Sequence, residues 1–331
     1  HRDLHSFPTR RSSDLIAKYN LGLKDAAKVN LEAAIKGGIK DSKVLLYAGY
    51  LRFDNNDFKG AVEALTAAEI GGEKETGIYE KRGKASFQQK DYAAAVVDLE
   101  NVVKKGNADL VTYEALGISY LNLQKDTEAV PALDKAAAMG SKNKDVYYQL
   151  GNARFKQNNF NGAIESYDKA VTLGAGDEVI FNNRGKAKLN KGEAKEAIED
   201  FTRALSIKQD YVLAYKNRAK ARYQLSEYTG VITDIAVLVA RNQADADDYA
   251  LLGLSRFNMK DYTGSVNDLT KAIEGGNKDR KVLSARGSSF LEMKEYEKAV
   301  TDLTRAIDGG EKTADVYAKR GKAKFLSNDF T

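Results

Sequence analysis

Small residues return every 34 positions along this chain, and this spacing constrains the fold more than any other feature of the sequence. The recurring residue is glycine in eight places and alanine in one. The nine residues are Gly49, Gly83, Gly117, Gly151, Gly185, Ala219, Gly253, Gly287 and Gly321. Glycine inside a helix costs roughly 1 kcal/mol relative to alanine, so its regular return predicts helices that cross closely there.

The segment from Lys144 to Asp177 is the clearest copy of the repeated unit. Apolar and small residues follow a helical spacing in each half of it. The first half carries Tyr147, Leu150, Gly151 and Phe155, and the second carries Phe160, Ala163, Tyr167 and Ala170. A polar turn separates the halves, and glycines follow the second. Each unit is therefore predicted to be a pair of amphipathic helices.

These residues resemble the signature of the tetratricopeptide repeat (TPR) family, which also has a 34-residue period. The resemblance covers residues 16–331. The matching residues of the clearest copy are Tyr147, Leu150, Gly151, Ala163, Tyr167 and Ala170. The family's final proline is absent, and glycines one or two positions earlier are expected to end most of the second helices. The resemblance implies an all-α fold, an α-solenoid superhelix of stacked antiparallel helix-turn-helix TPR units.

The period divides the chain into four kinds of segment. Residues 1–15 do not fit the repeat, and their string HSFPTRRSSDL resembles a translated sequencing adapter, so we expect them to be non-native. A basic targeting segment is the alternative. Residues 16–41 are expected to be a partial TPR unit, and residues 42–313 eight complete units. Residues 314–331 are expected to form the first helix of a further unit, which predicts truncation at both ends.

Composition argues against several classes of function. The chain has 52 Lys and Arg against 47 Asp and Glu, and the two signs alternate, so no basic stripe for nucleic acid is predicted. No apolar run is long enough for a membrane span. Cysteine is absent, and the only histidines are His1 and His5. With no nucleophile beside a base, no phosphate-binding loop and no metal-ligand cluster, the sequence predicts no enzyme, catalytic residue, cofactor or metal.

Matched charges recur between the two helices of a unit. Four units carry an arginine just before the small site and an aspartate 16 residues later. The pairs are Arg82 with Asp98, Arg184 with Asp200, Arg218 with Asp234, and Arg286 with Asp302. Where the first site is alanine or leucine, the second is alanine or serine, except for Leu252 with Asp268. This matched variation predicts interhelical ion pairs, each worth up to about 1 kcal/mol if exposed.

The family resemblance implies that the first helices line a concave groove, which commonly receives an extended peptide. The resemblance implies that the second, fifth, sixth, ninth, twelfth and thirteenth positions of each unit face this groove. At these positions, three consecutive units carry amide, ammonium and tyrosine side chains. The candidate peptide-binding residues are Tyr148, Asn152, Asn182, Asn183, Lys186, Lys216, Asn217 and Lys220. Amides can pair with a peptide backbone and lysines attract carboxylates, which favours an acidic or C-terminal peptide. A merely solvated helix face is the alternative.

Three functions compete on these observations. The leading hypothesis is a non-catalytic scaffold that binds a peptide or protein segment in the groove. The second is a targeting or regulatory array of a larger enzyme whose catalytic domain lies outside this sequence. The third is self-association, either through uncapped ends or through residues 230–242. That segment belongs to unit 212–245, where Val231 and Leu238 replace smaller residues and extend an apolar run.

Overall fold

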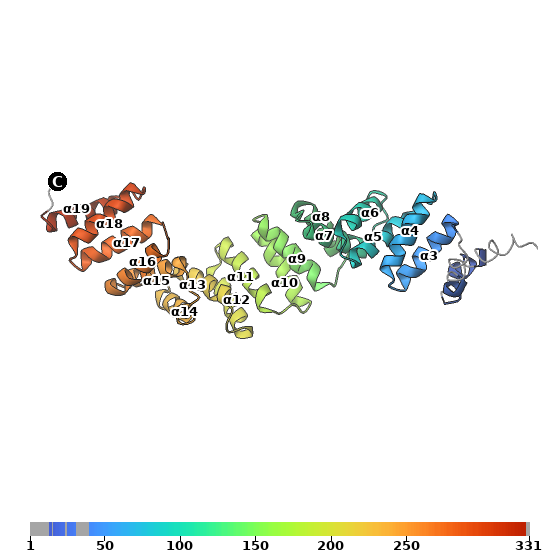
Figure 1. The fold of residues 1–331 in the computed structure, drawn as a ribbon. Helices are drawn as coiled ribbons and strands as arrows, with labels where there is room; N and C mark the ends of the chain where they lie inside the picture. The colour runs from blue at the N-terminus through green and yellow to red at the C-terminus, as the bar shows by residue number, and fades with distance from the viewer. Residues whose placement is uncertain (1–12, 15, 24, 31–39, 329–331) are drawn as a thin grey trace, which may run out of the picture. The chain divides into compact units, whose positions relative to one another are not determined.

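A computed structural model describes residues 13–14, 16–23, 25–30 and 40–328, and within these ranges all regular structure is α-helical. The helices form antiparallel pairs, and within each of the two compact parts of the chain these pairs stack in chain order, so the fold is an α-solenoid (Figure 1). The chain divides into two compact parts, residues 1–174 and residues 175–331. The expectations for residues 1–12, 15, 24, 31–39 and 329–331 lie outside the described residues.

Each 34-residue unit, called a repeat below, contributes one first helix and one second helix. In the N-terminal part the helices are α3 (Ser42–Asp54), α4 (Phe58–Ile70), α5 (Thr76–Gln88), α6 (Tyr92–Lys104), α7 (Leu110–Asn122), α8 (Asp126–Ala138), α9 (Lys144–Lys156) and α10 (Phe160–Thr172). In the C-terminal part they are α11 (Glu178–Lys191), α12 (Ala194–Ile207), α13 (Val212–Gln224), α14 (Tyr228–Ala240), α15 (Ala246–Asn258), α16 (Tyr262–Glu274), α17 (Arg280–Glu292), α18 (Tyr296–Asp308) and α19 (Ala314–Leu326).

Seven of the eight recurring glycines, all except Gly321, lie where the two helices of a repeat cross, as predicted. A Cβ at Gly185 would stand 2.8 Å from the ring of Phe201, and one at Gly253 would stand 2.6 Å from Leu269. Both neighbours belong to the second helix of the same repeat and are fully buried. The absent side chain therefore sets the distance between the helices.

The turns inside the repeats share one backbone conformation. One residue of each turn has a positive φ and lies in the left-handed region. These left-handed residues are Asn56, Lys90, Gln124, Asn158, Gly192, Ser226, Lys260, Lys294 and Asn328. The side chains of Asp57, Asp91, Asn159 and Asp261 then accept a backbone N–H of the second helix, as expected for N-caps.

Within each part, the first helices of successive repeats lie side by side, as α11, α13, α15 and α17 do. Among the described residues, the backbones of successive second helices within a part lie farther apart than those of successive first helices. Each part therefore curves with its first helices on the inner side, and their exposed residues line a concave surface. No described helix is both long and apolar enough to cross a membrane.

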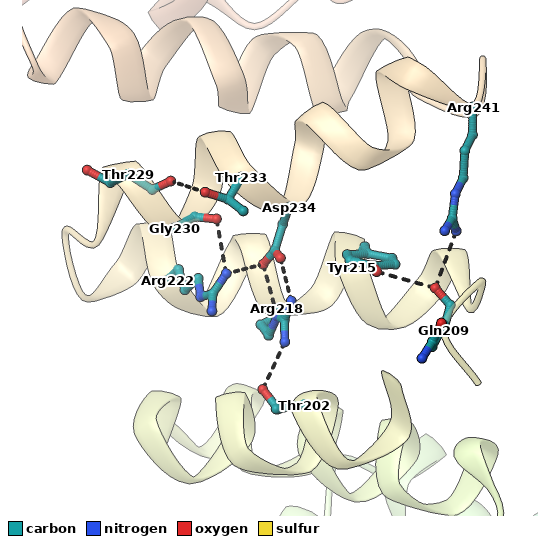
Figure 2. A network of polar contacts seen from close by, with 10 residues as sticks. All are labelled: Thr202, Gln209, Tyr215, Arg218, Arg222, Thr229, Gly230, Thr233, Asp234 and Arg241. Atoms are coloured by element: carbon teal, nitrogen blue, oxygen red, sulfur yellow. Dashed lines mark hydrogen bonds and ion pairs between the residues drawn. The ribbon is translucent and has the colours of Figure 1, made fainter. Parts of the chain in front are cut away.

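The four predicted Arg/Asp ion pairs are present. In the pair that Figure 2 shows, Arg218 Nη2 donates to Asp234 Oδ1 at 2.6 Å and Nε donates to Oδ2 at 3.1 Å. Arg222 adds a third bond to the same carboxylate at 2.7 Å. The aspartates of all four pairs are at most 4% exposed. They are buried pairs, so the estimate for exposed pairs does not apply to them.

The apolar run of repeat 212–245 packs against the first helix of its own repeat and the first helix of the next. Val231, Ile235 and Leu238 are fully buried and share a cluster with Ala219 and with Leu252 of the next repeat. No residue of the described segment 230–242 is a large exposed hydrophobic. The larger side chains thus repack a helix crossing, and self-association through this segment stays an untested hypothesis.

Candidate functional site

A depression of about 550 Å³ lies on the first-helix face of the C-terminal part. Helices α11, α13 and α15 form its walls. The lining residues are Lys186, Leu189, Asn190, Asn217, Lys220, Tyr223, Gln224 and Leu251. Counted from the start of each repeat, these residues occupy only positions 6, 9, 12 and 13. The inner face of the solenoid is therefore hollowed at the positions that the family resemblance assigns to the groove.

Two of the predicted lysines supply the charge of this depression. Lys186 and Lys220 occupy the same position in successive repeats, and both are exposed. They stand on neighbouring helices, α11 and α13, which lie side by side. A carboxylate bound in the depression would therefore lie near two ammonium groups.

The predicted asparagines of the C-terminal part are bonded to one another. Asn217 Nδ2 donates to Asn182 Oδ1 at 2.9 Å and so ties α13 to α11. Asn182 is only 3% exposed, and its own amide lies 3.5 Å from Asn183 Oδ1. Asn217 lines the depression. Asn182 does not line it, but accepts the hydrogen bond that holds the side chain of Asn217.

Lys216 does not stand free in the groove. Its Nζ lies 2.5 Å from Asp245 Oδ2 and 2.7 Å from Asp248 Oδ2. Burial lowers the pKa of Lys216, but the hydrogen bonds to Asp245 and Asp248 outweigh it and raise the pKa above its usual value. The lysine therefore stays charged, and Asp245 at the end of its own repeat and Asp248 in the next repeat already supply its counter-ions.

Tyr148 and Asn152 belong to α9, in the N-terminal part. The hydroxyl of Tyr167 donates to Asn152 Oδ1 at 2.8 Å. The ring of Tyr148 tilts against the ring of Tyr167, with centroids 6.2 Å apart. Both predicted residues thus pack on the second helix of their own repeat, and neither lines the depression of the C-terminal part.

The sequence-based choice of residues missed most of the apolar lining. Leu189, Tyr223 and Leu251 give the depression its apolar walls, and Asn190 and Gln224 add amides. The signal for all five was available, because positions 6, 12 and 13 of the repeat belong to the groove positions. The arrangement can hold an extended chain that combines a carboxylate with an apolar side chain. No cluster of metal-ligating residues occurs among the described residues.

Protein-family models for the tetratricopeptide repeat match residues 46–109, 145–174 and 180–211. The chain is similar to the solved structure of YrrB, described as a TPR protein with an unusual peptide-binding site. The two are 19% identical, with a TM-score of 0.48, over 56% of this chain and 95% of that one. A TPR protein from Parabacteroides merdae ATCC 43184 is 16% identical, with a TM-score of 0.47, over 75% and 98% of the two chains.

A third similar structure is the APC/C hetero-tetramer Cut9–Hcn1, with 19% identity and a TM-score of 0.46. The match covers 90% of this chain and 59% of that chain, so this chain spans less than two thirds of its length. No curated protein matches the sequence.

Proposed function

We propose that this chain is a non-catalytic scaffold that binds a peptide or protein segment in the groove of its first helices. The observation that carries the proposal is the depression between α11, α13 and α15. It is lined entirely from the inward positions of three successive repeats. The matches to TPR models over parts of both compact halves support a protein-interaction role.

The chemistry of the lining favours an acidic segment. Lys186 and Lys220 are the two exposed cations of the depression, and Asn217 lines the same depression. Tyr223 and Leu251 provide apolar surface beside these polar groups. A segment that places one carboxylate near the lysines and one apolar side chain on Leu251 would satisfy both kinds of surface.

A peptide selection tests the proposal on the full chain. A random dodecapeptide library displayed on phage would be selected against the protein, and the enriched peptides measured by fluorescence anisotropy. The enriched sequences are expected to be acidic. The double variant Lys186→Glu/Lys220→Glu is expected to weaken their binding by about tenfold or more, because attraction becomes repulsion.

Lys169→Glu/Lys195→Glu is the control with the same change in net charge, because Lys169 and Lys195 are exposed lysines of the second helices α10 and α12. This variant is expected to bind the selected peptides as the wild type does. If the control weakens binding as much as the groove variant, the peptides respond to net charge only and the groove proposal fails. An absence of any enriched peptide would also contradict it.

A further inference from the structure

Seven of the eight complete repeats carry an arginine at position 7 or position 11 of the first helix. These arginines are Arg52, Arg82, Arg154, Arg184, Arg218, Arg222, Arg256 and Arg286. The exception is repeat 110–143, which has Leu116 and Tyr120 at the two positions. This repeat therefore lacks a cation that the other complete repeats share.

The surroundings of the arginine at position 7 are similar from repeat to repeat. Arg218 bonds Asp234 at position 23 of its own repeat and donates to the hydroxyl of Thr202 at 3.0 Å, as Figure 2 shows. Thr202 occupies position 25 of the preceding repeat. The guanidinium also lies 5.7 Å from the ring centroid of Tyr215, at position 4. An anion, a polar group and an aromatic ring thus hold the cation.

Arg82 in the N-terminal part has the same kinds of neighbours. Its Nε lies 2.7 Å from Asp98 Oδ2, and its Nη1 lies 2.6 Å from Glu69 Oε2. The ring of Tyr79, at position 4, lies 5.7 Å from the guanidinium. Here the preceding repeat contributes a carboxylate, Glu69. The second helix of the preceding repeat can therefore place an anion beside the arginine.

Repeat 110–143 has a hollow of about 450 Å³ where these groups would meet. Ala132 stands in place of the aspartate, Glu100 in place of the threonine, and Tyr113 provides the ring. All three line the hollow. The remaining lining residues are Val103, Lys104, Leu116, Tyr120, Glu128, Pro131 and Lys135. The site thus keeps a ring and a carboxylate but has no arginine of its own.

Glu100 is held as an anion at the edge of this hollow. The hydroxyl of Tyr120 donates to its Oε1 at 2.5 Å, and Lys104 Nζ lies 3.0 Å from its Oε2. These two bonds lower the pKa of Glu100 below its usual value. The side chain of Lys104 is 76% exposed, so its ion pair is weak and can yield to a better-placed cation. Glu128, which is exposed, adds a second carboxylate.

We propose that the hollow between α6, α7 and α8 binds an arginine side chain of a partner protein. The guanidinium would donate to Glu100 and lie on the ring of Tyr113, and its aliphatic stem would pack on Leu116 and Pro131. The partner then supplies in trans the cation that the other complete repeats carry themselves. A planar guanidinium fits this site better than a lysine because it bonds a carboxylate and stacks on a ring together.

Three fluorescein-labelled heptapeptides, Gly-Ser-Leu-X-Leu-Ser-Gly, test this on the full chain. X is arginine, its neutral isostere citrulline, or norleucine. Anisotropy is expected to show the arginine peptide binding about tenfold more tightly than the other two, because only its side chain is positively charged and can form an ion pair with Glu100. Glu100→Gln is expected to remove most of that preference. The groove variant Lys186→Glu/Lys220→Glu should leave it unchanged, which separates this site from the proposed groove.

The variant Leu116→Arg/Ala132→Asp installs the ion pair that four other repeats carry at these positions. It is expected to keep the helical circular-dichroism spectrum and to lose binding of the arginine peptide, because its own guanidinium occupies the hollow. Equal binding of the arginine and citrulline peptides would overturn the proposal. So would unchanged binding by this variant or by Glu100→Gln, or no binding of the arginine peptide up to millimolar concentration.

Discussion

The ring of Tyr167 in α10 lies so close to Gly151 in α9 that a Cβ at Gly151 would stand 2.6 Å from Cε1 of the ring. Tyr167 is almost fully buried, and its hydroxyl is fixed by the bond to Asn152. The ring therefore cannot retreat without losing a hydrogen bond. One small residue and one large residue together set the crossing of the two helices.

Gly151→Ala is expected to destabilise the protein by about 1–3 kcal/mol, since the added methyl group overpacks a closed crossing. This loss would exceed the gain of up to about 1 kcal/mol that alanine brings to a helix interior. The midpoint of urea unfolding measures the difference.

Gly321→Ala is the matched control for that prediction. Gly321 occupies the same position of the repeat, in α19, and no described atom lies within 4 Å of a Cβ built there. Without overpacking, only the helix propensity remains, and the variant is expected to be as stable as the wild type or slightly more stable. If both variants lose stability equally, helix crossing is not the reason for glycine.

The buried pair of Arg286 and Asp302 is expected to behave as one unit. Arg286 Nε lies 2.6 Å from Asp302 Oδ2, and the aspartate side chain is 4% exposed. Asp302→Ala should destabilise by about 3 kcal/mol, because it leaves the mostly buried guanidinium of Arg286 without its counter-ion. Arg286→Leu/Asp302→Ala, the combination found in repeat 110–143, should recover at least half of this loss. Purely additive effects in the double-mutant cycle would show that the charges do not interact.

The left-handed turn residues predict opposite effects for two substitutions. Gly192 has a φ of 95°, and Lys294 has a φ of 62° at the same position of another repeat. Gly192→Ala should destabilise by about 1–2 kcal/mol, because a Cβ strains this conformation. Lys294→Gly should relieve the same strain and raise the unfolding midpoint. A loss of stability in both variants would contradict this account of the turn.

Much of the fold could be predicted because each repeat serves as a control for the others. The glycine at position 8 recurs while its neighbours vary, so Gly185 and Gly253 could be assigned to helix crossings without a structure. The Arg/Asp pairs were predictable for the same reason, because the residue types at the positions of Arg218 and Asp234 vary together from repeat to repeat. Their burial was not predicted, because the depth of a carboxylate depends on how the next helix covers it.

The candidate site was harder to predict, because its details depend on contacts between repeats. Lys216 is paired with Asp245 and Asp248, which follow it by about one repeat and belong to the start of α15. This pairing does not recur, so no comparison inside the chain revealed it. Asn182 has a polar side chain at a groove position, yet it turns toward α13 and is buried there. A periodic pattern predicts on which face of a helix a residue lies more readily than which group its side chain bonds.

Asp268 is expected to make the stability of the protein depend on pH. Its side chain is 7% exposed, and Arg256 Nη1 lies 2.8 Å from Oδ2 without the alignment of a hydrogen bond. Burial raises the pKa of Asp268 above 3.8, nearby Asp261 adds to the rise, and Arg256 and Lys271 oppose it. The folded protein therefore binds this proton more tightly than the unfolded chain does. Its contribution to stability is fully present below pH 3.8 and is lost as the pH rises through the folded pKa.

Asp268→Asn removes this titration while keeping the shape of the side chain. The variant is expected to be at least as stable as the wild type at pH 7, with an advantage that shrinks as the pH falls toward 4. Arg256, which is 30% exposed, can be hydrated once the carboxylate is gone. Urea unfolding at a series of pH values measures this difference, with Asp308→Asn in α18 as the control because Asp308 is an exposed carboxylate. An advantage of Asp268→Asn that grows as the pH falls would show that Arg256 stabilises the charged carboxylate more than burial opposes it.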